Sequence, residues 1–166
     1  MVPAGASSHT YEPTPRQMIE AGKALLWFQI GESFEKRAGE SLQNHHPKLQ
    51  LIDLQKGLDL IYDHCCGHAD HCHTNCVDPH FWLSTKQAKI QAHTMTNALV
   101  ATYPEHSSFF EKNLALFVSE LDQLDEQIQK IFTPTHQRIV LVSHPAYAYF
   151  CRDYNCRQLS IEFEGK

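Results

Sequence analysis

The chain has 166 residues, of which 42% are hydrophobic and 10% aromatic, and its formal net charge at pH 7 is −5. This length suits one ordinary domain, or parts of two small lobes, with an apolar core. The negative charge and the lack of a Lys/Arg-rich cluster exclude nucleic acid and anionic membranes as partners. No apolar run approaches the roughly 20 residues of a membrane helix, and the first residues lack the pattern of a targeting peptide.

The first half of the chain predicts a βαβ unit. Residues 14–17, TPRQ, combine an N-cap threonine, a proline at the first helical position and a capping-box glutamine. The apolar run 25–30 then predicts a buried parallel strand, an amphipathic helix follows over about 33–42, and 49–54 predicts the next strand. Strand, helix and strand in this order form a βαβ unit of an α/β fold.

The segment 63–84 concentrates metal-binding residue types, with five of the twelve histidines and four of the six cysteines. Imidazole and thiolate groups are the usual ligands of zinc and its first-row neighbours. We interpret the loop within this segment as a low-affinity metal collector, against the alternatives of a zinc knuckle and a solvated polar loop; its histidines are His64, His68, His71 and His73. The knuckle is disfavoured because the loop lacks paired CxxC spacing.

The six cysteines form two groups. Four lie in the His-rich loop, Cys65, Cys66, Cys72 and Cys76, and Cys151 and Cys156 lie near the C-terminus. In an oxidising compartment cysteines pair as disulfides, and in the cytosol they remain thiols or metal ligands. The spacing does not choose between these outcomes or select a pairing.

Two helices are predicted in the second half. Ser84 is the N-cap of a helix that extends to about Tyr103, where Pro104 follows. Ser108 and Glu111 predict a capping box for a helix over 108–132. Its apolar residues alternate steps of four and three: Phe110, Leu114, Phe117, Leu121, Leu124, Ile128 and Ile131. This seam suits a coiled coil or a long helix lying across a domain, and its short length of about three heptads favours the latter.

The C-terminal segment predicts two further strands. RIVLV, 138–142, is predicted as a buried strand, with Ser143 and His144 at its carboxyl end and Pro145 opening a helix. Open α/β sheets place ligand-binding groups at this end of a strand. Residues 158–164 predict a last strand, and a strand with little chain after it suggests a cut domain.

Three histidines share one context. His9, His80 and His144 each lie in a loop or at a strand end shortly before a predicted helix. Any one of them alone is more simply a solvated histidine, but three such imidazoles can converge on one metal at about 2.0–2.1 Å per bond. The fourth position is then left to a carboxylate or water. No GxSxG, HExxH, Walker or GxGxxG string occurs, so catalytic readings have little support.

Four strings in order resemble one known family: VPAGASSHTYEPTPRQM, DPHFWLS, the long heptad helix and HPAYAYFCRDY. They are similar to the metal-binding solute-binding proteins of zinc and manganese ABC importers, the ZnuA/TroA-like family. The resemblance covers essentially the whole chain. It implies that His9, His80 and His144 match the three histidine ligands of the family, and that a His-rich loop before the second ligand is typical of its zinc-selective branch.

The resemblance also implies an organisation. Family members have two α/β lobes joined by one long helix, with the metal between the lobes. The chain is then an α/β, partial bilobed solute-binding fold: 1–104 is the N-terminal lobe without its first strand and helix, 105–134 the linker helix, and 135–166 the start of the C-terminal lobe. The carboxylate ligand of the family has no counterpart here, and such a truncated chain is expected to self-associate.

The function expected from these observations is periplasmic or otherwise extracytoplasmic metal capture. The chain binds Zn²⁺, or less favourably Mn²⁺ or Fe²⁺, and delivers it to the membrane permease of an ABC transporter. Binding should weaken as imidazoles protonate below about pH 6. A zinc-dependent hydrolase using the same three histidines is the main alternative, with Asp78, Glu12 or Asp70 as its base. An interaction module held by the heptad helix is the other.

Overall fold

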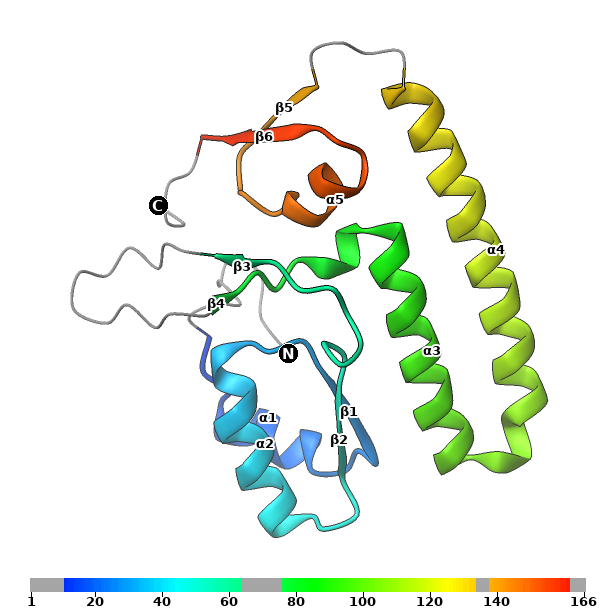
Figure 1. Ribbon diagram of the computed structural model, residues 1–166. Helices are drawn as coiled ribbons and strands as arrows, with labels where there is room; N and C mark the ends of the chain where they lie inside the picture. Colours follow the sequence, from blue (N-terminus) through cyan, green and yellow to red (C-terminus); the bar gives the residue numbers. More distant parts are fainter. Residues whose placement is uncertain (1–10, 64–75, 134–137, 162–166) are drawn as a thin grey trace.

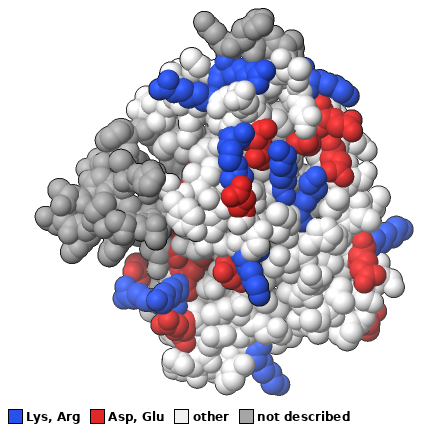
Figure 2. All heavy atoms as spheres, in the orientation of Figure 1, with Lys and Arg blue, Asp and Glu red and all other residues white. Residues whose placement is uncertain are grey.

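The structure is a computed structural model that describes residues 11–63, 76–133 and 138–161. Figure 1 shows an N-terminal part, a long helical hairpin, and a small C-terminal part beyond one end of that hairpin. Within the described ranges no helix is both long enough and apolar enough to cross a bilayer. On the face drawn in Figure 2 the basic and acidic side chains are interspersed.

The N-terminal part contains the predicted βαβ unit. Its elements are α1 (Pro15–Ala21), β1 (Leu26–Gln29), α2 (Ser33–His45) and β2 (Gln50–Asp53). Strands β1 and β2 are parallel, with Leu26 opposite Gln50. The Thr14 side chain accepts a hydrogen bond from the Gln17 backbone and completes the predicted capping box of α1. Four buried side chains from α2 and the ends of β2 form a small core: Ala38, Leu42, Leu49 and Leu54.

A buried carboxylate fixes the turn from β1 into α2. Glu35 Oε2 accepts hydrogen bonds from the backbone N–H groups of Ile30 (3.0 Å), Gly31 (2.7 Å) and Glu32 (2.9 Å). Gly31 has φ 93°, which side chains with a Cβ rarely adopt. Burial raises the pKa of Glu35, while the three backbone hydrogen bonds oppose that rise.

A short ladder leads to the DPHFWLS segment. Strands β3 (Tyr62–Asp63) and β4 (Cys76–Val77) pair antiparallel, and the 3₁₀ helix η2 (Phe81–Leu83) follows. The sequence analysis did not predict this ladder, because strands of two residues carry no periodic pattern.

The hairpin consists of α3 (Thr85–Thr102) and α4 (Ser107–Phe132), joined by the 3₁₀ helix η3 (Pro104–His106). The Ser84 side chain accepts from the Gln87 backbone N–H, so the predicted cap of α3 is confirmed. The capping box predicted for α4 at Ser108 is wrong. The 3₁₀ turn that begins at Pro104 runs directly into α4, and the N-cap residue His106 makes no side-chain cap.

The predicted apolar seam of α4 matches the packed face only in part. Phe117 is 46%, Leu124 44% and Ile131 67% exposed. An α-helix turns every 3.6 residues, so a seam written with a 3.5-residue repeat drifts around the helix. The less exposed positions include Val118, Asp125 and Phe132 instead.

The C-terminal part pairs β5 (Ile139–Val142) with β6 (Arg157–Ser160) in parallel, with α5 (Ala148–Asp153) between them in sequence. The prediction of a buried strand at β5 is wrong, since Ile139 is 56% and Leu141 68% exposed. The exposure alternates along β5, as expected for a ladder covered on one face within the described part of the chain. The described part of the predicted last strand, 158–164, forms β6 only as far as Ser160.

Hydroxyl and carboxylate groups join α5 to the hairpin. Asp125 Oδ1 accepts from Tyr154 OH (2.7 Å) and from Thr85 Oγ1 (2.9 Å), and Ser84 Oγ donates to Asp153. Burial of Asp125 acts to raise its pKa, but the two hydrogen bonds and the neighbouring lysines outweigh it, so the Asp125 pKa is lowered. Burial raises the pKa of Tyr154 to about 12.

Candidate metal centre

His80 is held by the segment around it. The backbone N–H of Asp78 donates a hydrogen bond to the Ile61 carbonyl (2.9 Å). The Asp78 carboxylate then accepts from the His80 backbone N–H (2.9 Å) and from His80 Nδ1 (2.7 Å). Directly after His80, the Phe81 side chain is fully buried. Local hydrogen bonds and packing therefore both fix the direction of this imidazole.

Tyr149 of α5 connects the C-terminal part to the His80 segment. Its hydroxyl donates to the Asp78 carbonyl (2.8 Å) and accepts from the Ile61 backbone N–H (3.0 Å). The ring is fully buried and makes an edge contact with Phe81, with centroids 6.2 Å apart. Burial raises the pKa of Tyr149, so the hydroxyl stays protonated and keeps its donor. The Tyr149 side chain thus helps to fix α5 against the His80 segment.

His144 follows β5 at its carboxyl end, as predicted. Helix α5 begins at Ala148, so the prediction that Pro145 opens a helix is wrong. Gln158 of β6 holds the intervening loop instead: its side-chain oxygen accepts from the Tyr147 backbone N–H (2.9 Å), and its Nε2 donates to the Pro145 carbonyl (3.5 Å).

The two imidazoles meet. The distance between His80 Nε2 and His144 Nε2 is 3.3 Å, and the ring centroids are 5.1 Å apart. The Asp78 carboxylate accepts from His80 Nδ1, so Nδ1 carries the proton and Nε2 of the neutral ring presents its lone pair toward His144. A carboxylate behind a histidine in this way is the usual arrangement that orients metal-binding imidazoles.

The separation of the two nitrogens matches tetrahedral zinc. With Zn–N bonds of about 2.0–2.1 Å, two nitrogens on one tetrahedral ion lie about 3.3–3.4 Å apart. The His80 side of the pair is also shielded, since the side chains of His80 and Asp78 are only 13% and 12% exposed. The arrangement brings together two imidazole nitrogens from different parts of the fold, as a metal site requires.

Most of the other predicted site residues are outside the part of the chain that the structure describes. His9 and the loop residues His64, His68, His71, His73, Cys65, Cys66 and Cys72 are outside the described residues. Cys76 begins β4, and Cys151 and Cys156 are free thiols. Across residues 11–63, 76–133 and 138–161, no three His, Cys, Asp or Glu side chains gather as a metal cluster. The described residues therefore contribute one pair of histidines.

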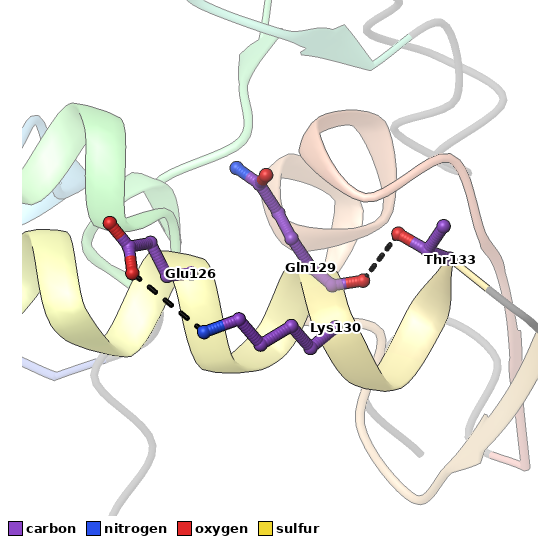
Figure 3. A pocket seen from close by; sticks show the side chains of 4 residues that line it. All are labelled: Glu126, Gln129, Lys130 and Thr133. Atoms are coloured by element: carbon purple, nitrogen blue, oxygen red, sulfur yellow. Dashed lines mark hydrogen bonds and ion pairs between the residues drawn. The ribbon is translucent and has the colours of Figure 1, made fainter.

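Three hollows lined by described residues do not include this pair. A hollow of about 410 Å³ lies at the end of α4 (Figure 3), lined by Glu126, Gln129, Lys130 and Thr133. There Lys130 pairs with Glu126 (3.9 Å), and the Thr133 hydroxyl donates to the Gln129 carbonyl (2.6 Å). These groups already satisfy one another, and neither histidine lines the hollow.

The sequence analysis missed the supporting residues. Asp78 was considered only as a base for hydrolysis, although its position two residues before His80 could have indicated an orienting carboxylate. Tyr149 gave no signal at all, because its partners are 71 and 88 residues away in sequence. Of the other bases considered, Glu12 pairs with Arg37 (3.6 Å) and Asp70 lies outside the described residues.

Comparison with known proteins identifies the family. The family described as "Zinc-uptake complex component A periplasmic", ZnuA, matches residues 1–166. The chain belongs to the ZnuA family. A crystal structure of ZnuA superimposes with a TM-score of 0.83 at 36% identity, covering 99% of this chain and 61% of that one. A ZnuA deletion mutant "plus zinc bound" gives 0.81 at 36% identity, with the same coverage of both chains. The predicted family and partial bilobed α/β fold are confirmed.

Relatives of the ZnuA family include a "Putative metal-binding protein" of Chlamydia trachomatis, 41% identical over 93% of this chain and 52% of the relative. The manganese-transporter lipoprotein PsaA of Streptococcus pneumoniae is 28% identical over 99% of this chain and 56% of its own. The zinc-binding lipoprotein AdcA of the same species is 27% identical over 97% and 33%. The chain spans about half the length of the first two relatives.

ZnuA-family membership bears on the predicted class and location. The family comprises extracytoplasmic solute-binding components of metal ABC transporters rather than enzymes. The chain is accordingly a member of a family of binding proteins. Nothing in these comparisons supports the hydrolase alternative.

Proposed function

We propose that the chain captures Zn²⁺ between its two lobes and delivers it to the membrane permease of an ABC transporter. The ligands are His80 and His144, with His9 as the third imidazole. The observation that carries this proposal is the 3.3 Å separation of the two Nε2 atoms. A solvent molecule or a carboxylate from another part of the protein takes the fourth position.

The two lobes in this proposal keep the predicted bounds. Residues 1–104 form the first lobe, 105–134 the connecting helix and 135–166 part of the second. His80 then belongs to the first lobe and His144 to the second, so separation of the lobes pulls the two nitrogens apart. Opening of this kind would release the ion to the permease.

Zinc binding requires a particular tautomer of each imidazole. His80 already has the required tautomer, because Asp78 holds its proton on Nδ1. His144 must carry its own proton on Nδ1 so that its Nε2 also offers a lone pair. The zinc ion then takes the place of the contact between the two Nε2 atoms.

Zinc is the preferred cargo because a site of neutral imidazoles suits it better than it suits manganese, which favours oxygen ligands. The relatives include both a zinc-binding lipoprotein and a manganese-transporter lipoprotein, so Mn²⁺ and Fe²⁺ are the competitors to test. We assign the loop histidines His64, His68, His71 and His73 an accessory role, as weak collectors of the same ion.

Metal content after exhaustive dialysis tests the proposal. The chain should retain about one zinc per molecule, and His80→Ala and His144→Ala should each retain none, with affinity lowered by at least about a hundredfold. His106→Ala is the matched control, since that imidazole is 61% exposed on η3. Replacing the four loop histidines by serine should leave the retained zinc unchanged. Zinc that survives both His80→Ala and His144→Ala would refute the proposed site.

A further inference from the structure

Helix α5 ends in a motif that brings two cysteines together. Asn155 follows the last helical turn with φ 50°, a left-handed conformation that asparagine tolerates. The backbone N–H of Cys156 donates to the carbonyl of Cys151 at 2.9 Å. A left-handed residue followed by this six-to-one hydrogen bond is typical of a Schellman motif, in which the side chains of the two bonded residues frequently contact each other. Here both of those side chains are thiols.

The geometry suits a covalent link. With the backbone atoms bonded at 2.9 Å, standard bond lengths keep the two Cα atoms within about 7 Å, the range over which a disulfide can form. The Cys156 side chain is also near enough to Cys151 to raise the pKa of that thiol. Cys151 is buried, with 6% of its surface exposed, whereas Cys156 is half-buried. Cys156 is therefore the more accessible of the two cysteines to an oxidant, and Cys151 is the more buried.

We propose that Cys151 and Cys156 form an intrachain disulfide that closes the end of α5 onto the start of β6. The spacing of the six cysteines left the pairing open, and the Schellman motif selects this one. Extracytoplasmic proteins meet an environment in which such bonds form and persist. The inference concerns the chain without its metal and does not depend on zinc binding.

The reaction is thiol–disulfide exchange with an oxidised dithiol protein or a small-molecule disulfide. The Cys156 thiolate attacks one sulfur of the oxidant, forms a mixed disulfide and expels the other sulfur as a thiolate. Cys151 then loses its proton to solvent and attacks the Cys156 sulfur, releasing the second thiol of the oxidant. The two cysteines lose two electrons and two protons, and the oxidant is reduced to two thiols.

The order of attack follows from burial. Burial and the contact with Cys156 raise the pKa of Cys151 to about 12, so this thiol is the poorer initial nucleophile. Once Cys156 carries the mixed disulfide, however, the attack by Cys151 is intramolecular and needs no encounter with a second oxidant molecule. Closing this short loop should raise the melting temperature by about 5 °C.

A tryptic map without reductant tests the proposal. After incubation of the full chain with oxidised glutathione and blocking of remaining thiols, trypsin cuts behind Arg138, Arg152 and Arg157. The peptides 139–152 and 153–157 then stay together only through the proposed bond. We expect the linked pair to dominate and to separate with dithiothreitol. Blocked thiols at both cysteines, or a link from either one to the His-rich loop, would overturn the pairing.

Two single variants separate the roles of the sulfurs. With Cys151→Ser, Cys156 should accumulate a glutathione adduct, because the resolving thiol is gone. With Cys156→Ser, the buried Cys151 should stay unmodified over the same time. Equal modification of the two variants would contradict the order of attack. The linked peptide in the unmodified chain tests the pairing even if a variant folds poorly.

Discussion

His80 and His144 reach the same point from supports that differ in packing. Around His80, Phe81 and Ser84 are fully buried, and the Asp78 carboxylate holds the imidazole. His144 follows β5, whose residues Ile139 and Leu141 are more than half exposed. Segments with few buried apolar contacts open at lower free-energy cost. The comparison teaches that the site joins a firmly held histidine to a more weakly supported one.

The largest expected effect lies on the His80 side. Asp78→Ala removes the acceptor of His80 Nδ1 and should weaken zinc binding by about 10- to 100-fold, as loss of an orienting carboxylate typically does. Asp78→Asn keeps an acceptor oxygen, so its zinc affinity should fall between those of the wild type and Asp78→Ala. Isothermal titration calorimetry measures both, with Asp59→Ala as the control for loss of charge, since that side chain is 84% exposed. Equal zinc affinities for Asp78→Ala and Asp59→Ala would show that Asp78 does not orient His80 for zinc binding.

Tyr149→Phe tests how α5 is fastened to the His80 segment. The variant keeps the ring contact with Phe81 but leaves the Ile61 N–H and the Asp78 carbonyl without their partner, which should cost about 1–3 kcal/mol of unfolding free energy. Zinc affinity should fall by less than about tenfold. Urea unfolding provides the measurement, and Tyr147→Phe, at a residue 37% exposed, is the control. If Tyr149→Phe is as stable as the control, the hydrogen bonds of the Tyr149 hydroxyl do not stabilise the packing of α5 on the His80 segment.

Asp125→Asn should give a pH-dependent loss of stability. The folded-state pKa of Asp125 is lowered, so its ionised form stabilises the fold above the ordinary value near 4, and this contribution disappears as pH falls through the folded-state pKa. We expect the wild type to have an unfolding free energy up to about 1 kcal/mol higher than that of the variant at pH 7, and a smaller advantage at pH 3. Denaturant melts at the two pH values decide the matter, and a pH-independent difference would argue against the ionic contribution.

The smallest effect is expected on the His144 side. Gln158→Ala removes two hydrogen bonds from the loop after His144, yet this partly exposed region has little packing to lose. Zinc affinity should change by less than about threefold, within the error of many titrations, so competition against a chromogenic chelator is the better measurement. A loss larger than that of Asp78→Ala would reverse the comparison between the two supports.

Local signals in the sequence predicted much of the fold. Thr14 and Ser84 cap the helices where expected, and the strands on either side of α2 pair in parallel. These features depend on residues close together in the chain. His80 and His144 were selected because each precedes a predicted helix, and the structure brings these two imidazoles together.

The predictions were wrong or incomplete where residues distant in sequence determine the local structure. Burial of β5 was inferred from its apolar composition, but burial depends on what covers a strand and not on the strand alone. The prediction of a helix from Pro145 was wrong because Gln158, on a later strand, accepts a hydrogen bond from the Tyr147 backbone N–H in the segment where that helix would begin. Tyr149 could not be found because its hydrogen bonds join residues that only the folded chain brings together.

The Ser84 hydroxyl belongs to two structures at once: it accepts from the Gln87 backbone as the cap of α3, and it donates to Asp153 at the end of α5. A hydroxyl has one proton to give, so if α5 moved away the proton would need a new acceptor while the cap remained. Separation of the lobes therefore leaves the cap of α3 intact and requires of Ser84 only a new acceptor for its proton. The nearby Trp82, 42% exposed, is an intrinsic fluorophore placed to report that movement.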